Sequence, residues 1–154
     1  MIHIENNRSG CPISTSLEIV GDSWSLIIIR DLFLQLTTFK EFMDSPEKIS
    51  SNILTDRLKK LKNFELISYV VNPIDKKVKN YYLTQAGIDF FPVIFNLSMW
   101  SKKHLDMEYN TIASQWFEDT QFKTQEEVIN QSIEAFINFR AELLNQNEDL
   151  SKVS

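Results

Sequence analysis

The sequence predicts a mainly α-helical fold with one small β-hairpin, an α+β chain. Three glycines and four prolines among 154 residues leave few places for tight turns, which is typical of a helical protein. Leu54, Leu58 and Leu61 recur at the spacing of one helix face. Residues 66–83 then form the pattern of two strands around a turn at 72–77, which contains a proline and two lysines. A short polar helix followed by a hairpin is therefore the central pattern.

Two helices are predicted in the first 34 residues. Apolar side chains in residues 13–20 have helical spacing, and Gly21 ends that segment. Asp22 or Ser23 can cap a second helix over residues 24–34. This second segment is too apolar for a surface helix, so we expect it to be the buried centre of the fold.

A helix-turn-helix pattern follows these two helices. Thr37 or Thr38 can cap a short helix, and Ser50 or Ser51 can cap the polar helix that carries the three leucines. The hairpin after the polar helix would supply a basic wing. This order predicts a winged helix-turn-helix, in which the polar helix enters the DNA major groove and the wing lies along the phosphates.

The predicted winged domain continues to residue 104. Thr84 can cap a helix from Gln85 onward, and Pro92 is expected to interrupt or kink it because proline lacks an N–H and clashes with the preceding turn. The helical spacing of apolar residues then resumes and ends near His104. We therefore assign residues 1–104 to the winged domain and residues 105–154 to a helical C-terminal extension.

The extension has its own composition. Ten acidic residues oppose Lys123, Arg140 and Lys152, which leaves a charge of −7. Thr124 and Glu127 have the spacing of a capping box at a helix start. An apolar stripe then needs a partner surface, so we expect the extension to belong to the same domain or to its dimer interface. The stripe consists of Ile129, Ile133, Phe136, Ile137, Leu143 and Leu144.

Positive charge is concentrated in the predicted polar helix and hairpin. Residues 48–83 contain eight lysines and arginines against three acids, a local charge of +5 on a chain whose net charge is −5. Phosphate neutralisation dominates DNA affinity, so a basic region on an acidic protein favours a local DNA-binding face. The candidate DNA-binding residues are Thr38, Lys40, Ser50, Ser51, Asn52, Thr55, Asp56, Arg57, Lys59, Lys76, Lys77 and Lys79.

Other classes of site are not expected from the composition. No apolar run approaches the ~20 residues of a membrane span, and no apolar signal core follows the N-terminus, so a cytoplasmic location is expected. One cysteine excludes an internal disulfide framework and a Cys-rich zinc site. His3 and His104 are far apart in sequence and have no ligand cluster around them. We expect no metal, no cofactor and no enzymatic activity, since no nucleophile–base pair or phosphate-binding loop is found.

With these residues placed, the chain resembles the HxlR-type regulators, a winged-helix family related to the MarR group. The resemblance runs from about residue 11 to residue 104, and its strength lies in the ordered spacing of many short matches. These are Cys11-Pro12, Gly21-x-x-Trp24, Phe39-x-x-Phe42, Ile49-Ser50, Leu54-Thr55-x-Arg57-Leu58-x-x-Leu61, Leu66-Ile67, Tyr82-Leu83-Thr84-x-x-Gly87, Pro92 and Trp100. The resemblance implies a homodimer on operator DNA, with terminal helices of both subunits forming the dimer contact.

Two positions depart from this family. Glu65 stands where the family usually has glycine, in the turn after the polar helix, and a left-handed backbone there is strained for glutamate. We therefore expect that turn to differ locally. The family also often has a basic residue near Ser68 and Tyr69, where this chain has none.

Some relatives use the N-terminal cysteine to sense oxidants or electrophiles, so Cys11 is a candidate redox sensor. The alternative is an unreactive, partly buried thiol. Without a second cysteine, Cys11 could bridge only to another subunit or to a small thiol. Trp24, Trp100 and Trp116 are expected in the core, with a ligand-stacking role for one of them as the alternative.

The function predicted from these features is a dimeric, sequence-specific DNA-binding transcriptional regulator, a repressor or a dual-acting switch, that responds to an unidentified signal. Its partners would be double-stranded operator DNA and a second copy of the chain, and a small-molecule effector remains open. The alternative is a winged-helix module that binds a protein partner through its acidic extension, with no specific DNA binding.

Overall fold

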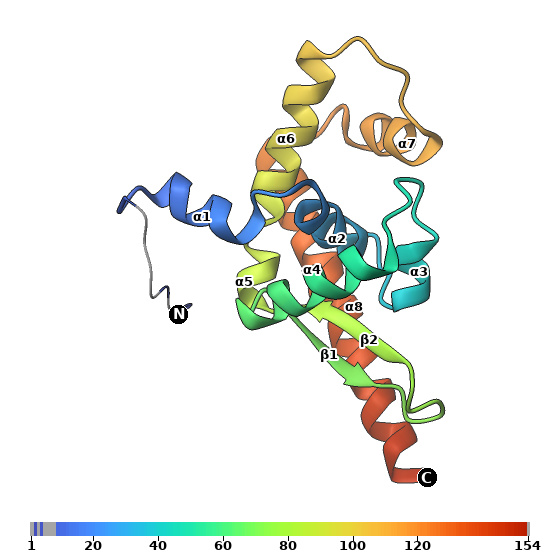
Figure 1. Cartoon of the computed structure of the whole chain (residues 1–154). Helices are drawn as coiled ribbons and strands as arrows, with labels where there is room; N and C mark the ends of the chain where they lie inside the picture. The colour runs from blue at the N-terminus through green and yellow to red at the C-terminus, as the bar shows by residue number, and fades with distance from the viewer. Residues whose placement is uncertain (1, 3, 5–8, 154) are drawn as a thin grey trace.

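A computed structural model describes the backbone of residues 2, 4 and 9–153, so His3 lies outside the described residues. A winged-helix body carries two further helices (Figure 1). Its elements, in chain order, are α1 (Pro12–Val20), α2 (Ser23–Phe33), α3 (Phe39–Met43), α4 (Ser51–Asn63), β1 (Ile67–Val71), β2 (Lys79–Leu83), α5 (Gln85–Ile88), α6 (Phe91–His104), α7 (Thr111–Thr120) and α8 (Gln125–Val153). This confirms the predicted mainly α fold with a small hairpin.

Side-chain caps fix where the helices begin. Asp22 caps α2 by accepting hydrogen bonds from the backbone N–H groups of Trp24 and Ser25. Thr38 and Glu41 form a complete capping box at α3. Ser50 caps α4, where its hydroxyl accepts from a backbone N–H of the first turn. Each side chain satisfies donors that a helix start would otherwise leave unpaired.

The hairpin joins α3 to the rest of the fold. β1 and β2 are antiparallel, with Tyr69 opposite Tyr81 in the register. The Tyr81 N–H donates to the Thr37 carbonyl at 2.7 Å, and Thr38 forms an isolated bridge with Asn80. The start of α3 is therefore held directly against the second strand of the wing.

The buried centre is α2, as predicted. Ile28, Ile29 and Leu32 are almost completely buried and share one cluster with the inward face of α4. Since α4 carries few other apolar residues, burial of its leucine face sets its orientation and leaves Asn52 and Thr55 exposed.

The helix expected after the hairpin is divided at Pro92. α5 ends at Ile88, and α6 begins with Pro92 in its first turn, where a missing N–H costs nothing. Gly87 in α5 lies so close to β1 that an added Cβ would stand 2.1 Å from the Leu66 carbonyl oxygen. Only glycine fits at this contact.

The extension packs on the winged domain of its own chain. Phe136 of α8 is 2% exposed, and its ring lies 5.2 Å from that of Phe33 in α2. Arg140 donates to the Leu83 carbonyl at 3.0 Å, which ties α8 to the end of β2. The first half of the predicted apolar stripe thus finds its partner surface within the chain. The separate helix α7 was not predicted from the sequence.

Two expectations are wrong in detail. Trp100 was expected in the core but is 57% exposed on α6. The turn after α4 was expected to change because of Glu65, yet Glu65 has φ +54° and keeps the left-handed backbone that favours glycine. Thr84 contacts this turn, since its hydroxyl donates to the Glu65 carbonyl at 2.5 Å and its N–H donates to the Leu66 carbonyl at 3.0 Å.

Candidate nucleic-acid interface

The position of α4 is fixed by an ion-pair cluster at the start of α2. The Asp22 carboxylate lies 2.9 Å from Arg57 Nε and 3.3 Å from Lys60 Nζ. Burial alone would raise the pKa of Asp22, but hydrogen bonds from Ser25 and Lys60 and the charge of Arg57 outweigh it and lower the pKa. The Asp22 carboxylate therefore both caps α2 and pairs with the Arg57 and Lys60 side chains of α4.

We predict that Asp22→Asn lowers the free energy of unfolding by about 0.5–1 kcal/mol at pH 7, since asparagine keeps one oxygen to cap α2 but removes the charge and the second acceptor oxygen. The folded-state pKa of Asp22 lies below its ordinary value of 3.8. The carboxylate therefore stabilises the fold above that value, and the gain disappears as the pH falls through the lower folded-state pKa. Urea unfolding at pH 7 and near pH 3 measures this difference.

Asp56→Asn is the matched control because Asp56 is 67% exposed and, within the part of the chain that the structure describes, its ion pair is with its neighbour Arg57. It should leave stability almost unchanged. A loss for Asp22→Asn that was equally large at both pH values would show that the charge of Asp22 has no stabilising role.

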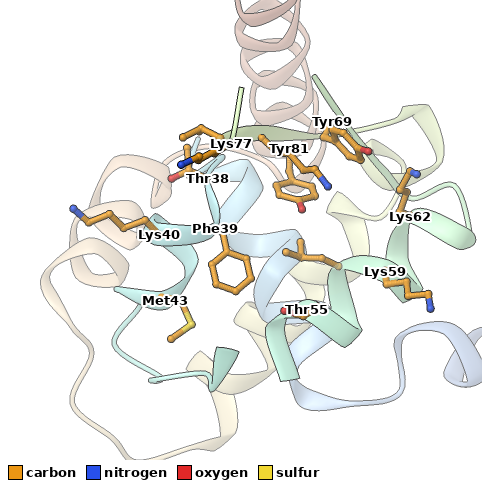
Figure 2. Close-up of a pocket in the computed structure, with 13 residues that line it drawn as sticks. Thr38, Phe39, Lys40, Met43, Thr55, Lys59, Lys62, Tyr69, Lys77 and Tyr81 are labelled. Carbon is orange, nitrogen blue, oxygen red and sulfur yellow. The ribbon is translucent and has the colours of Figure 1, made fainter. Parts of the chain in front are cut away.

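A groove of about 1010 Å³ lies between α3, α4 and the hairpin (Figure 2). Phe39 and Met43 of α3, Leu58 of α4, and Tyr81 of β2 supply apolar lining. Five lysines from all three elements surround it: Lys40, Lys59, Lys62, Lys77 and Lys79. The groove is therefore apolar inside and positively charged around its rim.

Tyr69 orients two of these lysines. Lys79 Nζ lies 4.4 Å from the centre of the Tyr69 ring, and Lys62 Nζ lies 5.2 Å from it. Tyr69 in turn packs against Tyr81, with ring centres 5.6 Å apart. Cation–π contacts hold the ammonium groups near the rim while leaving them open to a polyanion.

Half of the predicted DNA-binding residues line this groove. They are Thr38, Lys40, Thr55, Lys59, Lys77 and Lys79. The Thr55 hydroxyl donates to the Ser51 carbonyl at 2.8 Å, so its side chain is fixed on the exposed side of α4.

The other predicted residues lie around the groove. Ser50 caps α4, Ser51 and Asn52 are exposed in its first turn, and Lys76 is exposed in the wing turn. Asp56 and Arg57 pair with each other, and Arg57 also pairs with Asp22. The guanidinium of Arg57 therefore already has carboxylate partners within the fold.

Lys62 and Tyr69 line the groove but were not among the predicted DNA-binding residues. Lys62 was counted in the basic region but lies near the end of the helix, where its direction depends on helix phase. Tyr69 carries no charge, and only its register opposite Tyr81 brings it to the groove. Alternation along β1 could have suggested that the side chain lies on this face.

Other candidate features are separate from the groove. Cys11 is exposed and occupies the N-cap position of α1. Among the described residues, no group of three or more His, Cys, Asp or Glu side chains could hold a metal ion. None of the described helices is long and apolar enough to cross a membrane.

Comparison with known proteins places this architecture in a family. The model for the HxlR-like helix-turn-helix matches residues 19–109, which contain α2 to α6 and the whole groove. The chain belongs to the HxlR-like helix-turn-helix family. It is a transcriptional regulator of the helix-turn-helix type, and only α1, α7 and α8 lie largely or wholly outside the matched region.

Individual relatives agree with this assignment. The HTH-type transcriptional regulator YdeP of Bacillus subtilis is 34% identical over 98 residues, which cover 63% of this chain and 76% of YdeP. The crystal structure of the transcription factor PA1607 superposes with a TM-score of 0.59 at 30% identity, covering 68% of this chain and 72% of PA1607. The reduced form of YodB from B. subtilis gives a TM-score of 0.52 at 28% identity, covering 62% of this chain and 95% of YodB.

Proposed function

We propose that this HxlR-like protein represses transcription by binding operator DNA as a homodimer. The lysine-rimmed groove between α3, α4 and the hairpin is the observation that carries the proposal. In this proposal the exposed side of α4 enters the major groove, where Asn52 and Thr55 contact base edges. Lysines of the wing and of α3 contact phosphates on either side and carry no sequence information.

The homodimer is supported by apolar side chains left exposed on α1 and α6. Ile13 and Leu17 are exposed on α1, and Val93, Leu97 and Trp100 are exposed on α6. An apolar surface of this kind on a regulator favours a protein contact. We propose that it pairs two subunits so that two α4 helices read adjacent half-sites. Whether α8 also contributes to the dimer remains a prediction.

The experiment is binding-site selection from random DNA, followed by fluorescence anisotropy on the selected duplex and on a scrambled duplex at graded salt. We expect specific binding whose affinity falls steeply with salt, because phosphate contacts release counterions. Light scattering on the same sample should give two chains per operator. Absence of DNA binding at low salt would contradict the proposal and would favour a winged-helix module that binds a protein partner.

We propose that Cys11 is a redox sensor of this regulator. The exposed position of its thiol and the quinone-bound form in which the relative YodB has been solved support this role. We expect diamide to change the operator affinity of the wild type and to leave Cys11→Ser unchanged. Anisotropy with and without diamide measures the response. Equal responses of both proteins would leave Cys11 without a sensing role.

A further inference from the structure

A second, smaller cavity lies between the winged domain and the extension. It has a volume of about 290 Å³ and is bounded by the end of α2, the loop between α3 and α4, α6 and α7. Figure 1 shows α7 above this loop, on the side of the molecule away from the hairpin. Because α7 lies beyond the region matched to the family, this wall belongs to the chain's own extension.

Four aromatic residues, Phe33, Phe91, Phe95 and Trp116, line the cavity. Phe33 and Phe91 meet edge to face at 4.8 Å, and Phe95 and Trp116 meet in the same way at 5.9 Å. Phe91 and Phe95 are buried, whereas Trp116 from α7 is only partly buried. A flat ring placed here would contact several aromatic faces or edges at once.

One end of the cavity is polar and carries excess negative charge. Arg30 Nη2 lies 2.6 Å from Asp31 Oδ1, and Arg30 Nη1 lies 2.6 Å from Glu47 Oε1. The Ser45 hydroxyl also donates to Glu47, at 2.6 Å. The hydrogen bonds from Arg30 hold the pKa of Glu47 at about 2. Two carboxylates thus share one guanidinium, and the charged residues of the lining have a net charge of −1.

We propose that this cavity binds a small aromatic amine, with its ring between the aromatic walls and its ammonium group at the two carboxylates. The volume suits one or two fused rings, near the lower limit of ligand cavities. The same charges disfavour an aromatic acid, because Arg30 is already paired with Asp31 and Glu47 and these carboxylates repel a third one.

The cavity is connected to the DNA-binding groove through the loop that precedes α4. Glu47 lies in that loop, four residues before α4 begins at Ser51. A ligand that binds the Glu47 carboxylate acts on the loop that leads into the first residue of α4. The amine would therefore be an effector of DNA binding, and this role, unlike the binding site itself, rests on the proposed function.

The test is calorimetric titration of the full chain with three probes that share a naphthalene ring: 1-naphthylmethylamine, 1-naphthalenemethanol and 1-naphthoate. We expect the amine to bind one to one and the acid to bind at least about tenfold more weakly, since a charge–charge difference of 1.4 kcal/mol is sufficient for that ratio. Equal binding of amine and acid, or binding of none of the three, would overturn the proposal.

Variants locate the site. Ala113 lines the cavity, and Ala113→Phe should fill it and abolish amine binding, while Ala141→Phe on the exposed side of α8 should not. Glu47→Gln should keep alcohol binding but remove the preference for the amine, a change that a merely structural role would not cause. Amine binding that persists in Ala113→Phe, or an unchanged preference in Glu47→Gln, would contradict this site.

The operator affinity is then measured with and without the amine. A chain that binds the amine but no DNA would contradict the proposed function and leave the ligand site intact. A chain that binds the operator but not the amine would contradict the ligand site and leave the proposed function intact.

Discussion

Replacing Phe136 with alanine is expected to lower the free energy of unfolding by about 3–5 kcal/mol. Phe136 is 2% exposed and contacts Phe33 and Phe139 at ring-centre distances of 5.2 and 5.9 Å. Alanine would leave a cavity between α8 and the central helix α2, and packed neighbours fill such a cavity only partly. Urea unfolding followed by far-UV circular dichroism measures the loss.

Ile137→Ala is the control for this measurement. Ile137 is the next residue of the same helix but is 37% exposed, so its truncation should cost less than about 1 kcal/mol. Similar small losses for both variants would mean that α8 is not docked on the winged domain in solution. A large loss confined to Phe136→Ala would show that the extension stabilises the winged-helix body itself.

Thr55→Ala is expected to weaken operator binding by about 1–3 kcal/mol and to leave binding to scrambled DNA unchanged. Thr55 lines the groove, and the apolar face of its helix is buried, so its loss removes a contact with bases rather than a part of the core. Thr120→Ala is a close control, because the Thr120 hydroxyl makes the same type of backbone hydrogen bond in α7. Equal operator affinity of the two variants would exclude Thr55 as a base contact.

Lys77→Ala should instead weaken specific and non-specific binding together. A phosphate contact releases counterions without reading sequence, so the slope of log affinity against log salt should fall by about one. Lys123→Ala, in the acidic extension, should leave the slope unchanged. A Lys77 variant that lost only specific binding would show that the wing contacts bases.

Patterns within a single element predicted the fold well. The spacing of Leu54, Leu58 and Leu61 located α4 and its buried face, and the polar residues ahead of α2, α3 and α4 reduced the start of each to one of two positions. The choice between Thr37 and Thr38, or between Ser50 and Ser51, could not be made from the sequence, because both residues of each pair carry a hydroxyl. In the structure Thr38 is the cap of α3. The same segment contacts β2, through the Thr37 carbonyl and through the bridge between Thr38 and Asn80.

Features that depend on contacts between distant segments were not predicted. Arg57 follows Asn52 and Thr55, the residues expected to contact bases. In the structure, however, Arg57 forms an ion pair with Asp22 at the start of another helix. Trp100 has the spacing of a core residue, and periodicity alone does not say whether an apolar face meets its own chain or remains exposed. The aromatic cavity could not be predicted for the same reason, since it exists only once α7 is placed across α6.

The packing of α8 also brings acidic side chains onto the winged-helix body. α8, with exposed Glu134 and Glu142, lies behind α2 and α4 in the view of Figure 1, while the lysine-rimmed groove is formed by α3, α4 and the hairpin. We expect these acidic side chains and the lysines of the groove to orient the groove toward a polyanion before contact. Such steering raises the rate of encounter and suppresses approach by the acidic side, and salt weakens both effects. We therefore expect the extension to influence how fast the regulator finds DNA without contacting it.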